Sequence, residues 1–383
     1  MLKANWNYPT KVRVGRGRIS ELPAACAELG MKMPLLVTDP GLANSVLVEN
    51  TLALMQDAGV TTSVFCQIKA NPTGEQVMDG VATYHQGAHD GVIAFGGGSA
   101  LDAAKAIALM VGQERSLWDF EDVGDNWLRV NVGAMAPVIA VPTTAGTGSE
   151  VGRASVITDS EQQIKKIIFH PNMLPSLVIL DPELTVGLPK PITAATGMDA
   201  LSHCLEAYCA PGYHPMAEGI ALEGIRLIKE NLLAAYHEGT NLAARTNMLV
   251  ASSMGATAFQ RGLGAMHALA HPLGALYDAH HGRLNAILMP YVLRANRSAI
   301  EERIERLARY LSLDGGFDGF WGWINHMRSE LGIESNLAEI GIDTSQVERL
   351  ATMATADAAS GSNPIVFTQQ QYKDILYSAC NGL

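Results

Sequence analysis

The stretch Val92-Ile93-Ala94-Phe95-Gly96-Gly97-Gly98-Ser99 decides the fold of the first half of the chain. Its four apolar residues predict a buried strand, and the glycines that follow predict a tight turn into a helix. Glycines let the backbone approach a ligand closely, and the free N–H groups at the start of a helix attract an anion. The stretch therefore predicts a nucleotide diphosphate-binding loop, although a simple turn would need the same glycines.

Apolar runs on both sides of this stretch extend the prediction to a whole domain. Residues 35–38, 137–141 and 177–180 are predicted strands, whereas residues 73–86 and 99–110 carry Ala, Leu and Met at helical spacing. Strands that are apolar throughout are typical of a parallel sheet covered on both faces. We expect residues 1–187 to form an α/β, doubly wound, Rossmann-like domain that binds a dinucleotide.

The pattern changes after Gly187-Leu188-Pro189-Lys190-Pro191. From there to the C-terminus the sequence is rich in Ala, Leu, Glu and Met, has few β-branched runs, and is interrupted by Pro and Gly. We expect residues 188–383 to form an all-α domain that carries the metal and the catalytic residues. A 383-residue chain is long enough for two such cores.

Two features of the first domain bear on the cofactor. A second loop, residues 141–150, follows a predicted strand and offers several hydroxyl and N–H groups. Asp39 ends the strand at residues 35–38, where a carboxylate would bind an adenosine ribose and repel a 2′-phosphate. This position favours NAD over NADP, and the alternative is an Asx turn before Pro40.

One Asp and three His residues in the second half could hold a metal ion. Asp199 and His203 are four residues apart, so a helix would place them on one face. His267 and His281 could complete the set of ligands. Three imidazoles and one carboxylate suit Fe(II) or Zn(II) better than Mg²⁺ or Ca²⁺, and the same donors also bind Ni, Co and Mn. The alternative is a scatter of unrelated core and surface histidines.

Composition narrows the cellular setting. A net charge of −11 argues against nonspecific nucleic acid binding, and the sequence lacks an apolar run long enough for a membrane span. Met1–Asn7 carries no apolar signal core, and five cysteines without a CxxC pair suit a reducing compartment. We expect a cytoplasmic protein without membrane or nucleic acid partners. Residues 12–17 are expected to form an edge hairpin, paired within the chain or with a second subunit.

Taken together, the motifs resemble the iron-dependent (group III) alcohol dehydrogenases along nearly the whole chain. The matching segments are Asn71-Pro72-Thr73, Gly96–Ser99 with Asp102 and Lys105, Pro142–Glu150, Gly197–His203 and His267–His271. The resemblance implies a small alcohol or aldehyde substrate, Fe(II) or alternatively Zn(II), NAD, and a homodimer. It also implies reversible hydride transfer between NAD(H), held across the crevice between the domains, and a primary alcohol, with the metal as Lewis acid.

The resemblance also assigns residues. The metal ligands would be Asp199, His203, His267 and His281, with His271 near the substrate as a proton relay. The implied nucleotide-binding residues are Asp39, Asn71, Gly97, Gly98, Ser99, Asp102, Thr143, Thr144 and Thr147.

The segment Phe259-Gln260-Arg261-Gly262-Leu263-Gly264 is more similar to the branch that includes the 4-hydroxybutyrate (succinic semialdehyde) dehydrogenases. Arg261 would then pair with a substrate carboxylate. The alternative is that Arg261 caps a helix C-terminus or forms an ion pair away from the substrate. A further departure is Asn363-Pro364-Ile365, where many relatives have arginine after the proline.

Two other functions are compatible with parts of the pattern. One is a metal- and NAD-dependent cyclase or lyase of the dehydroquinate synthase type, which needs a basic cluster for a phosphorylated sugar acid. Near the metal motifs the sequence offers Arg261 and Arg283 but no clear cluster. The other is a non-catalytic metal- or nucleotide-binding module, against which the complete ligand set and both loops argue.

Overall fold

The computed structural model describes residues 10–382, so the prediction made for Met1–Asn7 lies outside the described residues. The chain divides into two compact units. A sheet unit comprises the described residues up to Thr144 together with Gly148–Gly187, and a helical unit comprises Ala145–Thr147 and the chain from Leu188 onward. The short segment 145–147 thus packs with the helices although it follows a strand of the sheet.

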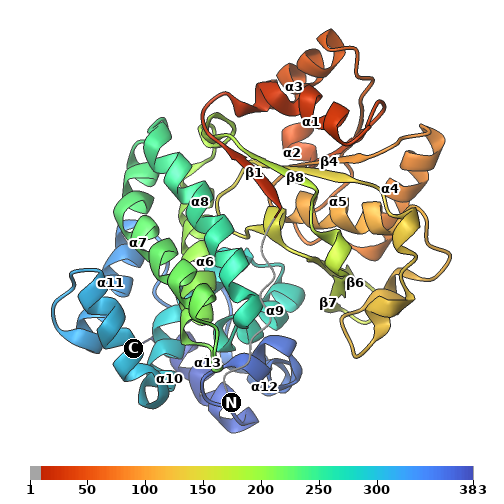
Figure 1. Cartoon of the computed structure of the whole chain (residues 1–383). Coiled ribbons are helices and arrows are strands. Elements are labelled where there is room, and N and C mark those ends of the chain that lie inside the picture. The colour runs from red at the N-terminus through yellow and green to blue at the C-terminus, as the bar shows by residue number, and fades with distance from the viewer. Residues whose placement is uncertain (1–9, 383) are drawn as a thin grey trace. The chain divides into compact units, whose positions relative to one another are not determined.

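The sheet unit is built on six parallel strands (Figure 1). They are β1 (Lys11–Val14), β2 (Leu35–Val37), β3 (Ser63–Phe65), β4 (Val92–Gly96), β5 (Val138–Pro142) and β8 (Leu177–Leu180), in the order β1-β8-β5-β4-β2-β3. The four apolar runs of the sequence are therefore strands, and the fold class is confirmed. In the four central strands, β8, β5, β4 and β2, the residues of both faces are buried, because helices cover both sides of the sheet.

Each face of the sheet is covered by its own helices. On one face α1 (Leu22–Glu28) and α3 (Val46–Asp57) share a core with every second residue of the strands, such as Ile93 and Phe95. On the other face α5 (Gly98–Met110) packs against β2, β4 and β5, and α4 (Gly74–Gln86) packs against α5. A one-turn helix, α2 (Pro40–Ala43), follows β2.

Two parts of the sheet unit differ from expectation. The predicted hairpin at residues 12–17 is wrong, because β1 pairs in parallel with β8 at an edge of the sheet and the chain turns away at Gly15 and Gly17 with positive φ. A separate antiparallel pair, β6 (Ala154–Asp159) and β7 (Ile164–Phe169), was not predicted. Seven 3-10 turns connect these elements: η1 (Arg18–Glu21), η2 (Leu117–Phe120), η3 (Asn126–Arg129), η4 (Val132–Ala134), η5 (Ser149–Val151), η6 (Pro171–Met173) and η7 (Pro182–Thr185).

The helical unit surrounds one fully buried helix, α6 (Lys190–Cys209). Every residue from Thr193 to Cys209 is buried, and α7, α8 and α10 pack against this helix. A helix without an exposed face must satisfy its polar side chains inside the protein. The other helices are α7 (Pro215–His237), α8 (Leu242–Ala258), α9 (Ala265–Tyr277), α10 (His281–Tyr310), α11 (Gly316–Glu330), α12 (Val347–Ala356) and α13 (Gln369–Asn381), with 3-10 turns η8 (Phe259–Arg261), η9 (Ala338–Ile340), η10 (Thr344–Gln346) and η11 (Ala358–Ser362).

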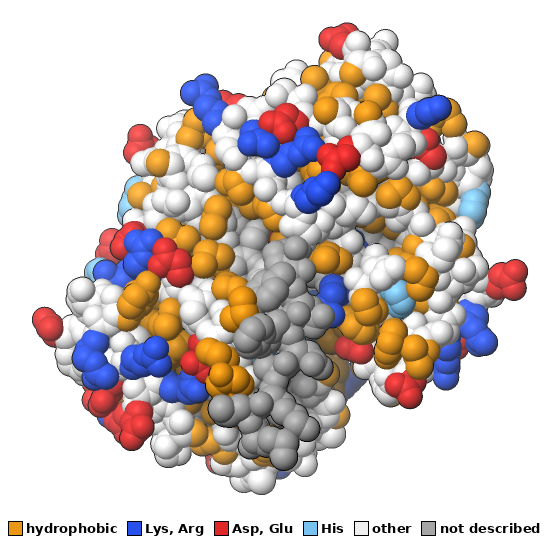
Figure 2. Space-filling view, in the orientation of Figure 1, with side chains coloured by type: hydrophobic (Ala, Val, Ile, Leu, Met, Phe, Trp, Pro, Cys, Tyr) orange, Lys and Arg blue, Asp and Glu red, His pale blue; other side chains and the backbone are white. Residues whose placement is uncertain are grey.

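The surface mixes charges of both signs. On the face shown in Figure 2, basic side chains lie among acidic ones. Near the start of the sheet unit, for example, Arg13 pairs with Glu21 and Glu28. Within residues 10–382, none of the helices combines the length and the apolar character that a membrane span requires.

Candidate metal centre and nucleotide loops

Helix α6 provides the first two candidate ligands. Asp199 and His203 lie one turn apart on this buried helix, with 2% and 5% of their surfaces exposed. The Nδ1 atom of His203 lies 3.2 Å from the carbonyl oxygen of Gly146. Because a carbonyl oxygen only accepts, Nδ1 carries the proton, and the lone pair on Nε2 is available for a metal.

The other two candidate ligands come from α9 and α10. His267 is in the first turn of α9 and is buried, and His281 is the first residue of α10. One donor atom from each of Asp199, His203, His267 and His281 lies within 4.8 Å of the others. Three helices therefore bring the four residues together, although they are spread over 83 positions of the sequence.

The donor set fits a divalent metal ion. A buried carboxylate and neutral imidazoles are costly unless a cation or hydrogen bonds compensate them. Burial, reinforced by His203, lowers the pKa of His267 well below its usual value, so this ring is neutral and able to bind a metal at pH 7. An acidic oxygen with three imidazole nitrogens suits Fe(II) or Zn(II). The assignment of these four residues as ligands stays a prediction that the geometry favours.

A buried glutamate orients His267 from behind. The Nδ1 atom of His267 lies 2.7 Å from Oε2 of Glu206. Oε2 also accepts a hydrogen bond from the backbone N–H group of Gly264, and Oε1 accepts one from that of Met266. Burial raises the pKa of Glu206 to about 7, and the three donors around it favour the ionised form. A carboxylate that binds the far nitrogen of a metal-ligating imidazole fixes its tautomer and orientation.

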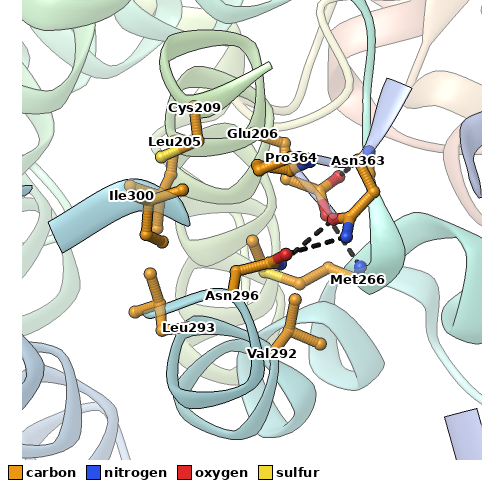
Figure 3. A pocket seen from close by; sticks show the side chains of 11 residues that line it. Leu205, Glu206, Cys209, Met266, Val292, Leu293, Asn296, Ile300, Asn363 and Pro364 are labelled. Atoms are coloured by element: carbon orange, nitrogen blue, oxygen red, sulfur yellow. Dashed lines mark hydrogen bonds between the residues drawn. The ribbon is translucent and has the colours of Figure 1, made fainter. Parts of the chain in front are cut away.

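Figure 3 shows a small cavity next to Glu206. Leu205, Val292, Leu293 and Ile300 give it an apolar wall. Asn296, from the same helix as Val292, Leu293 and Ile300, exchanges hydrogen bonds of 2.8 and 3.1 Å with Asn363. Oδ1 of Asn363 also accepts from the N–H group of Ala265. This buried amide pair fixes the start of α9, which carries His267.

Asn285 also lies among the candidate ligands. It sits one turn after His281 on α10, is fully buried, and places its Nδ2 atom 2.9 Å from Oδ1 of Asp199. The same atom is 3.2 Å from Nε2 of His267 and 3.2 Å from Nε2 of His281. The amide nitrogen of Asn285 therefore lies between three of the four donor groups, and its two hydrogens can serve two of them at a time.

His271 lies beside the four candidate ligands and is not one of them. Its ring centroid is 5.5 Å from that of His281, in a nearly parallel stack, and 5.9 Å from that of His267. The imidazole is 15% exposed, so it can exchange protons with solvent more readily than the buried His267. This position is compatible with the predicted relay.

The glycine-rich stretch forms the expected loop at the end of β4. Gly96 has φ +145°, and Gly97 is the N-cap of α5. The strand order turns from one direction to the other between β2 and β4, which is the switch point where parallel sheets bind ligands. Asp39 follows β2 at this point, and its Oδ2 lies 3.6 Å from where a Gly96 Cβ would stand. Oδ1 of Asp39 forms the Asx turn with Gly41 and Leu42.

The hydroxyl residues predicted to bind the nucleotide are distributed over the two units of the chain. Thr143 and Thr144 follow β5, where Thr143 donates its N–H to Gly96 and Thr144 lies against Gly97. Ser99 donates to the carbonyl oxygen of Ala70, next to Asn71, which ties that loop to α5. Thr147 belongs to the helical unit, apart from the other eight predicted nucleotide-binding residues. Their contact with NAD stays a prediction.

Both carboxylate oxygens of Asp102 accept hydrogen bonds from other residues of the sheet unit. Its Oδ1 accepts from the Ser149 hydroxyl, its Oδ2 accepts from the N–H of Val156 at 2.9 Å, and Lys105 lies 3.3 Å away. Lys105 is buried and also donates to the carbonyl oxygens of Ser149 and Ala154. This network joins the helix after the glycine loop to the segment after the second loop. The contact of Asp102 with the nucleotide stays a prediction.

Arg261 makes the contacts that were considered as the alternative to substrate binding, namely helix capping and an ion pair. Its guanidinium donates to the carbonyl oxygens of Tyr208 and Gly212 at 3.1 and 2.8 Å, beyond the last turn of α6, and pairs with Glu218 at 2.9 Å. Only 2% of the side chain is exposed. Tyr208 is nine residues from Asp199, roughly 13 Å along the helix axis. Helix capping and Glu218 therefore hold the guanidinium, as the alternative expected. The binding of a substrate carboxylate by Arg261 stays a prediction that these contacts do not favour.

Three residues of the site were missed by the sequence analysis: Glu206, Asn285 and Asp357, the last of which binds His271. Glu206 and Asn285 carry a signal in their spacing, because they follow His203 by three residues and His281 by four. Asp357 is 86 residues from its partner, and no local pattern relates the two.

A substitution at Gly282 tests how closely α10 must approach α6. A Cβ at this position would lie 2.3 Å from the carbonyl oxygen of Ala195 and 3.0 Å from Cβ of Asp199. Because backbone cannot yield as a side chain does, we expect Gly282→Ala to reduce the free energy of unfolding by about 1–3 kcal/mol. We also expect weaker metal binding, measured by competition with a chelator. Gly219→Ala, where nothing lies within 4 Å, is the control and should leave both unchanged or raise stability slightly. Equal metal affinity in both variants would contradict the account.

Two family models match the chain. The model "Iron-containing alcohol dehydrogenase" matches residues 9–182, and "Fe-containing alcohol dehydrogenase family, C-terminal" matches residues 193–380. The 4-hydroxybutyrate dehydrogenase of Cupriavidus necator is 38% identical and the alignment covers 96% of this chain and 98% of the relative. The NAD-dependent methanol dehydrogenase of Bacillus methanolicus is 34% identical, with 98% and 99% covered.

Solved structures agree with these matches. The crystal structure of 1,3-propanediol oxidoreductase superposes with a TM-score of 0.93 at 35% identity, covering 98% of this chain and 100% of that one. Sulfoacetaldehyde reductase from Bifidobacterium kashiwanohense, solved in complex with NAD+, superposes with a TM-score of 0.90 at 28% identity, with 99% of both chains covered. With both halves matched by its models and relatives aligned over nearly their full length, the chain belongs to the iron-containing alcohol dehydrogenase family.

Proposed function

We propose that this chain catalyses reversible hydride transfer between NAD(H) and a primary alcohol or its aldehyde, with one Fe(II) held by Asp199, His203, His267 and His281. The observation that carries the proposal is the convergence of these four donors within 4.8 Å in a chain of the iron-containing alcohol dehydrogenase family. Zn(II) is the alternative ion, because it accepts the same donors at similar distances.

The bound ion would supply a Lewis acid that stabilises negative charge on the substrate oxygen. The residues of the chain supply the remaining functions. His267 and His203 are held in their neutral, metal-binding tautomers by Glu206 and by the carbonyl of Gly146. His271, beside the donor set and partly exposed, accepts the hydroxyl proton in oxidation and returns it in reduction.

The loops of the sheet unit support NAD as the hydride carrier. Free N–H groups at the start of α5 and the glycines before it suit a pyrophosphate, and Asp39 lies at the adjacent strand end. Oδ2 of Asp39 is free of the Asx turn and would repel a 2′-phosphate, which favours NAD over NADP. Asn71, Gly97, Gly98, Ser99, Thr143, Thr144 and Thr147 remain proposed nucleotide contacts, whereas Asp102 acts through the loops that it joins.

The alternatives gain no support. A dehydroquinate synthase type of reaction would need free cationic groups for a phosphorylated sugar acid. Arg261 is held by Glu218 and by backbone carbonyls, and Arg283 pairs with Glu334. A non-catalytic binding module would not require a buried donor set with orienting carboxylates.

The substrate is proposed to be a small primary alcohol with a negatively charged end, such as 4-hydroxybutyrate, whose product is succinic semialdehyde. The similarity to a 4-hydroxybutyrate dehydrogenase and to a sulfoacetaldehyde reductase supports this class. Since Arg261 is engaged elsewhere, another donor must bind the carboxylate.

We also propose a cytoplasmic homodimer. All five cysteines are free, which suits a reducing compartment. Among residues 10–382, β1 has no strand on its outer edge, and this edge is where we place the contact with a second copy. Sedimentation at the mass of two chains and recovery in the cytoplasmic fraction are the expected results. Sedimentation as a single chain, or recovery outside the cytoplasm, would contradict the corresponding proposal.

His267→Ala tests the metal-centred reaction. We expect the wild-type protein loaded with Fe(II) to produce NADH absorbance when alcohol and NAD+ are added, with net turnover that a cyclase would not give. The variant should bind metal more than about 100-fold more weakly and lose activity in parallel, with an unchanged circular dichroism spectrum. His326→Ala on α11, where the side chain is exposed, is the matched control and should behave as wild type. Full activity in metal-free His267→Ala protein would refute the mechanism.

A matched substrate pair tests the charged-substrate proposal. We expect kcat/KM for 4-hydroxybutyrate to exceed that for 1-pentanol by about 10-fold or more, the value of one charge-assisted hydrogen bond. Arg261→Ala should lower the Tm, because Glu218 and the end of α6 lose their partner, and should leave this preference intact. Equal kcat/KM values for the two alcohols would remove the proposal, and loss of the preference in Arg261→Ala would restore Arg261 as the carboxylate-binding residue.

A further inference from the structure

Asp357 lies behind His271 in the same way that Glu206 lies behind His267. Oδ2 of Asp357 is 2.8 Å from Nδ1 of His271. The two histidines are one turn apart on α9 and each has a carboxylate on its Nδ1 side. The difference is exposure: Glu206 is buried, whereas the Asp357 side chain is 18% exposed.

The position of Asp357 is itself fixed. Its Oδ1 accepts from the N–H group of Ala359 at 2.9 Å, which caps η11, and its own N–H donates to Ala354 at the end of α12. Six residues later Asn363 accepts from the N–H group of Ala265 at the start of α9. The segment 357–363 is therefore attached to α9 at two points, and the carboxylate is placed before substrate arrives.

We propose that Asp357 is a positioning residue, which holds His271 with its proton on Nδ1 and its Nε2 lone pair open to the substrate. An ionised carboxylate only accepts hydrogen bonds, so it selects the tautomer in which Nδ1 donates. Among residues 10–382, Nε2 of His271 has no hydrogen-bond partner, so this atom is available to accept a proton. The inference rests on the proposed dehydrogenase function.

This arrangement gives the hydroxyl proton of the substrate an acceptor while the hydride leaves. In oxidation the C–H bond of the alcohol carbon breaks, and its electron pair moves with the hydrogen to the nicotinamide ring of NAD+. The O–H bond breaks, its electrons form the second carbon–oxygen bond, and the proton goes to Nε2 of His271 directly or through one water. The imidazolium that results is stabilised by Asp357 until the proton leaves to solvent. Reduction of the aldehyde reverses each transfer.

The test compares Asp357→Asn with Asp343→Asn. Asparagine remains a good N-cap, so both variants keep the turn that the aspartate begins, η11 or η10, and lose only the charge. We expect Asp357→Asn to retain the metal content and Tm of the wild type, with kcat about 10- to 100-fold lower and KM within about two-fold. Asp357→Glu, which restores a carboxylate, should recover part of kcat, and Asp343→Asn should match the wild type in every measurement.

A spectroscopic measurement separates positioning from a merely structural role. In Zn(II)-loaded protein with ¹⁵N-labelled histidine, His271 should show the Nδ1-protonated tautomer, and Asp357→Asn should lose this preference. A wild-type kcat in Asp357→Asn, or an Nε2-protonated His271 in the unaltered protein, would overturn the inference. If the wild type forms no NADH from any alcohol, the proposed function fails instead, and the tautomer still decides whether Asp357 orients His271.

Discussion

The convergence of one buried carboxylate, two buried imidazoles and the partly exposed imidazole of His281 around a common point is the constraint on which the helical unit depends. Asp199, His203 and His267 are each at most 5% exposed, and hydrogen bonds from Asn285 alone do not neutralise a buried carboxylate. A divalent cation at this point would satisfy all four donors at once. The packing brings the donors together, because α6 has no exposed face from Thr193 to Cys209 and α10 begins so close to α6 that Gly282 has no room for a Cβ.

Around these donors lies a second set of groups that determines what each imidazole does. Glu206 and the carbonyl of Gly146 bind the outer nitrogens of His267 and His203, and Asp357 binds that of His271. Under the proposed function, the same kind of hydrogen bond would serve two purposes. Behind His267 and His203 it would leave the inner nitrogen available to a metal, and behind His271 it would leave that nitrogen available to a proton.

The sequence was sufficient for the parts of the fold that repeat locally. The apolar runs at β2, β4, β5 and β8 and the glycine turn after β4 were predictable, because strand burial and helix starts leave their pattern within about ten residues. The i, i+4 spacing of Asp199 and His203 was equally local. The β6–β7 pair and the parallel pairing of β1 were not predicted, because their partners are set by contacts made only in the folded chain.

The same limit explains why the partners of Arg261 and Asp357 could not be read from the sequence. A guanidinium next to a glycine-rich turn is compatible with a substrate carboxylate or with a helix end, and only the fold brings Tyr208, Gly212 and Glu218 to it. Asp102 was predicted to bind the nucleotide, and only the fold shows that its oxygens also accept hydrogen bonds from Ser149 and Val156. In each case a polar side chain found its partner far away in the sequence.

X-ray absorption at the iron edge of the anaerobic Fe(II)-loaded protein tests the central claim most directly. We expect one iron per chain, with three imidazole nitrogens and one carboxylate oxygen as protein ligands at about 2.0–2.2 Å. The spectrum should also show multiple scattering from the imidazole rings. A chain that retains no iron, or iron whose spectrum lacks imidazole scattering, would contradict it.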